Sequence, residues 1–310
     1  MGIIRFLLAA SVICAHFGGI YGNNLIGGAL AVQSFFLLSG FYIVLILEEN
    51  FSVKSFQEYK SFLSSRLFRL YPAYWLSLAI KFIWGVGFSS TFYSLNLFSK
   101  LYIVLSNLFL FNLDLLCFQV VNSDGSLSFA KFPATTGAWA HELLTLNIPA
   151  WTLGTELWFY LLIPIFYPGK LRNLIIICLA IFLFHSWMLH FGLTTRPWNY
   201  RFFGFEIRWF MLVRNFMNWR FLKFLAFFAP FIFYVTKSSK IDRFIGNLSY
   251  PIYIFHFSVS GGMGMTKALG GNSALNVLIA STIFATGFNL LIQNPIDRWR
   301  HKKFEGINQA

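Results

Sequence analysis

Two basic side chains in the first apolar segment are spaced so that they could act together. Arg5 and His16 are eleven residues apart within the apolar run 3–20. At about 100° per residue, eleven steps bring a helical side chain back to within about 20° of its starting face, about 16 Å further along the axis. Arginine binds anions, and a neutral imidazole can take the proton of a hydroxyl. The simpler interpretations are an interfacial anchor for Arg5 and a packing histidine for His16.

A second pair of cations lies where the third apolar run, 67–88, begins. Arg66 and Arg69 are three residues apart, so they occupy neighbouring positions on one helical face. We expect them at the start of a helix, where two guanidinium groups can hold phosphate with a donor geometry that lysine does not offer. The alternative is a positively charged anchor on the cytoplasmic side, followed by a belt of aromatic residues.

Further polar groups lie inside apolar runs, where ionisable side chains are expensive and therefore candidates for function. Glu156 is followed by a long apolar stretch and needs either a cationic partner or a wet cavity. His256 lies a few residues into the run 244–262. Trp151 and Tyr160 flank Glu156, and such rings either stack on a sugar or form an interfacial belt.

The composition indicates the class of protein that carries these polar side chains. Of the 310 residues, 57% are hydrophobic and only 11% are charged, whereas a soluble domain has about 25% charged residues. The composition excludes an ordinary soluble protein and predicts an all-α, polytopic integral membrane protein. A net charge of +13 is also what excess Lys and Arg in cytoplasmic loops produces, so we expect no nucleic-acid partner.

About ten transmembrane helices are predicted, because a span needs about 20 apolar residues. The runs are 3–20, 29–47, 67–88, 101–118, 149–167, 173–191, 202–217, 221–236, 244–262 and 274–292. We expect them to form one transmembrane domain over 1–310, without an appended soluble domain. The first run lacks a small-residue cleavage site and is predicted to be retained rather than removed as a signal peptide.

The distribution of charge predicts the orientation. With the N-terminus inside, most of the 24 Lys and Arg residues fall on the inner side, so both termini are predicted to be cytoplasmic. We therefore place the chain in the inner (plasma) membrane as a multi-pass protein. Cys14, Cys117 and Cys178 lie in apolar runs without a CxxC pair, which predicts neither a disulfide framework nor a metal site.

Taken together, these stretches resemble the membrane-bound acyltransferase 3 family, which includes bacterial O-antigen and exopolysaccharide O-acetyltransferases. The first run matches the family's Arg/Lys-x10-His motif. The other matches, in chain order, are FFLLSGF at 35–41, which contains Ser39, RLFR at 66–69, WTLGTE with its trailing FY at 151–160, and SYPIYIFH at 249–256. Two positions depart from the family pattern. Gln33 and Gln293 stand where many members carry Asp and Glu, which puts a charged role there in doubt.

The resemblance implies an O-acyltransferase that moves an acyl group from cytoplasmic acyl-CoA, with acetyl-CoA favoured, to a hydroxyl of a cell-envelope or exported carbohydrate or a lipid-linked sugar. On that basis His16 is the candidate base, with Arg5 and Glu156 as further catalytic residues. Glu156 would orient the imidazole or stabilise its cation. Substrate-binding roles fall to Arg66, Arg69, Ser39, Trp151, Tyr160 and His256. Acyl-CoA is a donor substrate, and no bound cofactor is expected.

Several readings stay open at this stage. A covalent acyl-histidine intermediate competes with general base catalysis at His16. A transporter or flippase for a lipid-linked or anionic substrate would also use intramembrane His, Glu and Arg. A protein that carries the acyl group across the bilayer would combine the two. The acyl group, the acceptor sugar and the oligomeric state do not follow from the sequence.

Overall fold

The computed structural model describes residues 1–51, 55–84, 87–166, 216–263 and 272–305, together with Leu179 and Leu183. These residues fall into two compact units, one built from 1–86 and 215–310 and the other from 87–214. The prediction of a single domain over 1–310 stays a prediction.

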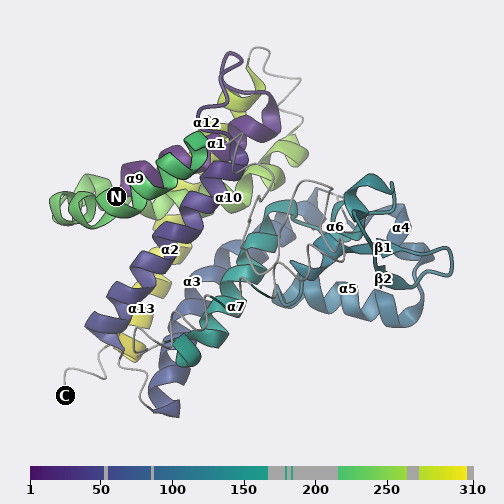
Figure 1. Ribbon diagram of the computed structural model, residues 1–310, viewed down its shortest axis with the longest axis horizontal. Coiled ribbons are helices and arrows are strands. Elements are labelled where there is room, and N and C mark those ends of the chain that lie inside the picture. Colours follow the sequence, from purple (N-terminus) through teal and green to yellow (C-terminus); the bar gives the residue numbers. More distant parts are fainter. Residues whose placement is uncertain are drawn as a thin grey trace. The chain divides into compact units, whose positions relative to one another are not determined.

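The first unit is a set of packed helices (Figure 1). They are α1 (Gly2–Phe17), α2 (Gly28–Asn50), α3 (Phe56–Ile83), α9 (Phe216–Thr236), α10 (Lys240–Met263) and α12 (Ser273–Phe288). The last of these continues through the π-helical segment η4 (Asn289–Gln293), α13 (Asn294–Arg300) and the π-helical segment η5 (His301–Glu305).

Helix α1 packs against α2, α10 and α12. The core that α1 forms with α10 and α12 is built from small and aliphatic residues, Ala9, Ile13, Leu248, Ile252, Val277 and Ala285. The helices α1 and α10 approach most closely where Gly2 meets Gly246. A Cβ atom on Gly246 would lie 2.8 Å from the Cα atom of Gly2, so the crossing depends on glycine.

The ends of these helices are fixed by side chains. Ser55 caps α3 by accepting a hydrogen bond from the amide of Glu58, a residue type that favours the first helical turn. Asn272 caps α12, and its Nδ2 atom also donates to the carbonyl of Gly19, just after α1. The start of α12 is thereby tied to the end of α1.

The second unit is built from shorter pieces. It contains α4 (Ser90–Ser94), α5 (Leu97–Phe109), η1 (Leu115–Phe118), β1 (Gln119–Val121), β2 (Leu127–Phe129), η2 (Pro133–Thr135), α6 (Ala140–Leu144), η3 (Ile148–Ala150) and α7 (Trp151–Phe166). The strands form an antiparallel hairpin in which Val120 pairs with Ser128. The side chain of Asn107 holds α5 to the segment after α6 through bonds to the carbonyl of Leu144 and the amide of Leu146.

A helix lies at each predicted span that falls within the described residues. The predicted spans 173–191 and 202–217 lie almost entirely outside them. Two described helices, 28–50 and 273–304, are long and apolar enough to cross a membrane. The structure therefore bears out the helical fold class, whereas ten spans are not confirmed.

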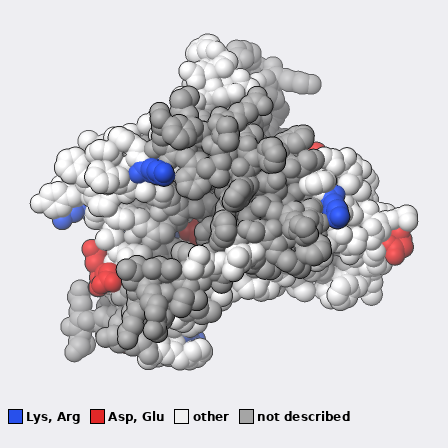
Figure 2. Space-filling view, viewed as in Figure 1, with Lys and Arg blue, Asp and Glu red and all other residues white. Residues whose placement is uncertain are grey.

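Apolar side chains cover much of the described surface. Leu97 and Phe98 on α5, Phe227 on α9 and Leu291 on η4 are among the large exposed ones. On the face drawn in Figure 2, few Lys, Arg, Asp and Glu side chains of the described residues are visible. Such a surface suits contact with lipid.

Candidate active site

Helix α1 carries both Arg5 and His16, as the spacing predicts. Arg5 lies in the first turns and His16 in the last turn, because the helix ends at Phe17 and Gly18 turns the chain in the left-handed region with φ 85°. Arg5 is half-buried and His16 is exposed. The helix rise separates the two by about 16 Å along the axis, so α1 defines two sites rather than one.

A basic cavity of about 200 Å³ surrounds Arg5 at the first of these sites. Four cationic side chains line it, Arg5 from α1, Arg69 from α3, Lys237 from the connection between α9 and α10, and Arg243 from α10. Its other lining residues are Met1, Gly2, Tyr42, Phe233, Thr236, Asp242, Gly246 and Asn247. Arg5 and Arg69 are half-buried, whereas Lys237 and Arg243 are exposed, so the first two are the more enclosed of the four.

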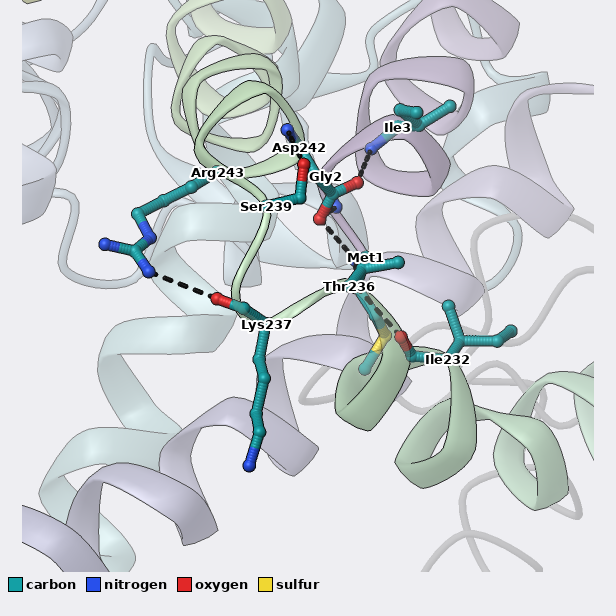
Figure 3. Close-up of polar contacts among 9 residues, drawn as sticks. All are labelled: Met1, Gly2, Ile3, Ile232, Thr236, Lys237, Ser239, Asp242 and Arg243. Carbon is teal, nitrogen blue, oxygen red and sulfur yellow. Dashed lines mark hydrogen bonds and ion pairs between the residues drawn. The ribbon is translucent and has the colours of Figure 1, made fainter.

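The position of Arg5 is set from two directions. Its guanidinium carbon lies 5.5 Å from the centroid of the Tyr42 ring on α2, a cation–π distance. The start of α1 is held by Asp242 of α10, whose Oδ2 atom accepts hydrogen bonds from the Met1 ammonium at 2.6 Å and the Gly2 amide at 2.8 Å. Its Oδ1 atom accepts from the Ile3 amide at 3.0 Å (Figure 3). A carboxylate at a helix N-terminus also interacts favourably with the helix dipole.

The electrostatics of Asp242 follow from these contacts. Burial by itself raises the pKa of the Asp242 carboxyl, but hydrogen bonds from Gly2, the Met1 ammonium and Ile3 outweigh burial and lower this pKa to about 2. Asp242 precedes the predicted span 244–262. Arg243 bonds outward, to the carbonyl of Lys237 at 3.1 Å, and so links the two exposed cations of the cavity (Figure 3).

The two arginines of the RLFR motif separate in the structure. Arg69 lines the basic cavity, whereas Arg66 does not and is buried. Arg66 donates to the Ser65 hydroxyl at 3.3 Å, and Arg300 of α13 donates to the same hydroxyl at 3.2 Å. Arg300 also pairs with Asp297 at 3.1 Å. Arg66 therefore belongs to a polar cluster between α3 and the C-terminal helices.

The expected location of this motif at a helix start is wrong. Helix α3 begins at Phe56, ten residues before Arg66, because Ser55 provides the N-cap. The apolar run marks only the part of the helix after the motif. Arg66 and Arg69 are thus interior residues of a 28-residue helix.

At the other end of α1, His16 meets the second motif histidine. The rings of His16 and His256 are stacked, with centroids 5.6 Å apart and planes 27° apart. Phe257 contacts both rings, at 5.0 Å from His16 and 4.7 Å from His256. The two histidines are far apart in the sequence, and they meet because α1 and α10 pack closely together, as at Gly2 and Gly246.

Four further predicted site residues are not among the residues that line the basic cavity. Ser39 is a half-buried residue in α2 and does not line the basic cavity. Trp151, Glu156 and Tyr160 lie on α7 in the second unit, where the Tyr160 hydroxyl donates to Oε1 of Glu156. The predicted roles of all four stay predictions.

Sequence reasoning missed several residues of the first unit. Lys237, Asp242 and Arg243 lie outside the predicted spans, and Tyr42 lies in a span as one of many aromatic residues, so nothing in the sequence marks them. Lys81 of α3 is a cation inside the predicted span 67–88, and it lies near enough to His256 to interact with it electrostatically. Its position within an apolar run is the sequence feature that could have marked Lys81 as a candidate functional residue.

Comparison with known proteins identifies the family. A family model described as an acyltransferase domain, acyltransferase 3, matches residues 1–213. The match includes Arg5, His16, Arg66 and Arg69, whereas His256 and the cations of α9 and α10 lie beyond it. No curated protein and no solved structure matches the chain. Because the matched residues make up more than half of the sequence, the chain belongs to the acyltransferase 3 family.

Proposed function

We propose that this acyltransferase moves an acyl group, acetyl in the first instance, from cytoplasmic acyl-CoA to a hydroxyl of a cell-envelope or exported carbohydrate. Its site would lie in the inner membrane, with both termini cytoplasmic. The observation that carries the proposal is that α1 presents Arg5 to a basic cavity at one end and His16 at the other.

The basic cavity supports a phosphorylated donor. Its four Lys and Arg side chains face one carboxylate, Asp242, which is already occupied by the start of α1. The surplus of positive charge suits the phosphate groups of coenzyme A, and guanidinium groups bind phosphate through paired donors. We assign the phosphates to Arg5 and Arg69. Because Arg66 lies outside the cavity lining, we assign it to the polar cluster that holds α3.

The distance between the two ends of α1 fits the shape of such a donor. Acyl-CoA carries its phosphates at one end and its thioester at the end of an extended pantetheine arm. With the phosphates at Arg5, the thioester would reach His16 about 16 Å along the helix. One substrate can thus occupy both sites.

The reaction itself is an acyl transfer with general base catalysis. His16 takes the proton of the acceptor hydroxyl while the hydroxyl oxygen forms a bond to the thioester carbonyl carbon. The carbon–sulfur bond then breaks, and the thiolate leaves with the electron pair and takes the proton from His16. The products are the acyl ester and free coenzyme A, and no external reductant or oxidant is needed.

The test measures acetyl transfer by purified protein from labelled acetyl-CoA to an envelope-glycan extract of a deletion strain. His16→Ala should lower kcat about 10²- to 10⁴-fold, the contribution of a general base. Arg69→Gln should raise the KM for acetyl-CoA about 10- to 100-fold, because it removes a charge-assisted bond. The control is His301→Ala, which alters an exposed histidine of η5. Full transfer by the His16 variant, or uptake of an unmodified substrate by proteoliposomes, would contradict the proposal.

A further inference from the structure

The tautomer of His256 is fixed by its own helix. The side chain is fully buried in α10. Its Nδ1 atom lies 2.6 Å from the carbonyl oxygen of Tyr253. A carbonyl can only accept, so Nδ1 carries a proton and donates it to this bond. In the neutral ring, Nε2 then holds a lone pair and can only accept.

That lone pair is unused. Within the part of the chain that the structure describes, Nε2 of His256 has no hydrogen-bond partner. A buried polar atom without a partner is destabilising by about 1–3 kcal/mol, so folding alone gives no reason to keep an acceptor at this position. A phenylalanine would fill the same space beside Phe257 without that disadvantage.

Two basic side chains lie near the ring of His256: Lys81 interacts with it electrostatically, whereas His16 is in direct ring contact. Among the described residues, the rings of His16, Phe17, Tyr253 and Phe257 contact His256. Tyr253 engages Nδ1 through its backbone carbonyl, the two phenylalanine side chains have no polar atoms, and His16 is the one of these four rings that becomes a cation when it takes a proton. His16 is exposed and stacked on the buried ring. A substrate can therefore reach His16 first, with His256 behind it.

We propose that His256 is a positioning residue for His16: its Nε2 lone pair accepts a hydrogen bond from the N–H of His16, directly or through one water, once His16 has taken the acceptor proton. The inference rests on the proposed function of His16. It adds a second histidine, which stabilises the imidazolium without receiving its proton.

The proton balance is simple. The O–H bond of the acceptor breaks and an N–H bond forms on His16, which leaves a cation next to His256. The Nε2 lone pair of His256 faces this cation as a hydrogen-bond acceptor until the departing thiolate takes the proton. His256 has the same protonation state before and after the transfer, with its proton on Nδ1.

Two amide substitutions separate this role from a structural one. His256→Asn places an amide near Nδ1, so it keeps the donor to the Tyr253 carbonyl and loses the acceptor. His256→Gln places its amide oxygen near Nε2 and keeps the acceptor. His256→Phe removes both and keeps the ring. Each is assayed for acetyl transfer from labelled acetyl-CoA to the glycan extract, with kcat and the donor KM measured separately.

We expect His256→Asn and His256→Phe to lower kcat about 10- to 150-fold, the factor for loss of a hydrogen bond to a charged group. His256→Gln should stay within about fivefold of wild type, and the donor KM should change by less than about twofold in all three. A His256→Asn enzyme that is active while the Gln enzyme is not would assign the residue to the Tyr253 bond and overturn the proposal. Wild-type kcat in all three variants, or a change confined to KM, would also overturn it.

A double-mutant measurement covers the case in which one variant does not fold. In the His16→Ala background, adding His256→Asn should lower the residual rate by less than about twofold, because the two residues act as a unit. Independent, multiplying effects would refute the coupling. If His16→Ala and Arg69→Gln themselves leave transfer unchanged, the proposed function fails. If they reduce transfer and the His256 variants do not, only the present inference fails.

Discussion

The bond between Asp242 and the start of α1 makes a sharp stability prediction. The two carboxylate oxygens of Asp242 accept from three donors. The Met1 ammonium and the Gly2 amide donate to Oδ2, and the Ile3 amide donates to Oδ1. In Asp242→Asn one of the two oxygens becomes an NH2 group, which faces a donor and cannot accept. At least one hydrogen bond to a charged group is lost, and those that remain are made to a neutral acceptor.

The expected destabilisation is about 2–3 kcal/mol, since a hydrogen bond to a charged group contributes about 1.5–3 kcal/mol. For a chain of this size the melting temperature should fall by about 4–10 °C. The assay is thermal unfolding of the detergent-solubilised protein. The donor KM should also rise, because Arg5 lies one turn beyond the loosened helix start.

The matched control is Asp124→Asn in the hairpin between β1 and β2. Asp124 accepts from the amide and the hydroxyl of Ser126 at 2.9 and 2.6 Å, and both bonds fall on the same oxygen, Oδ1. An asparagine keeps that oxygen, so Asp124→Asn should leave the melting temperature almost unchanged. If Asp242→Asn melts within about 1 °C of wild type, the hydrogen bonds of Asp242 to the start of α1 contribute less to stability than expected, and the reasoning is refuted.

The remaining predictions concern pH, the cavity and the helix crossing. Because the pKa of Asp242 is lowered from 3.8 to about 2, its stabilisation is present above pH 3.8 and lost as the pH falls to about 2. The difference in melting temperature between wild type and Asp242→Asn should be constant near neutral pH and shrink below pH 4; a constant difference at pH 2.5 would contradict this. Lys237→Gln, at the exposed rim of the cavity, should raise the acetyl-CoA KM only about two- to fivefold, whereas Lys240→Gln, outside the lining, should not change it. Gly246→Val should abolish stable packing of α1 on α10, seen as loss of a monodisperse size-exclusion peak, while Gly287→Val, where a Cβ meets no atom within 4 Å, should not; equal profiles would remove the crossing as the reason.

Much of the helical framework followed from the sequence. Each predicted span within the described residues contains a helix, because backbone groups in an apolar environment must be satisfied within a helix, although in the run 101–118 the helix ends at Phe109. The helical period alone placed Arg5 and His16 on one face. The boundary of α3 was missed because apolarity reports contact with lipid, whereas the helix begins at its cap, Ser55.

The sequence by itself therefore determined the fold class, the family motifs and the residue types available for chemistry. Only the tertiary structure decided their grouping. Arg69 and Arg66 are equivalent in the motif, yet packing directs the first to the basic cavity and the second to Ser65 and Arg300. Likewise, His16 and His256 are 240 residues apart and meet because Gly2 and Gly246 let α1 and α10 approach closely. Spacing along one helix fixes neighbours within that helix, but contacts between helices depend on which surfaces fit.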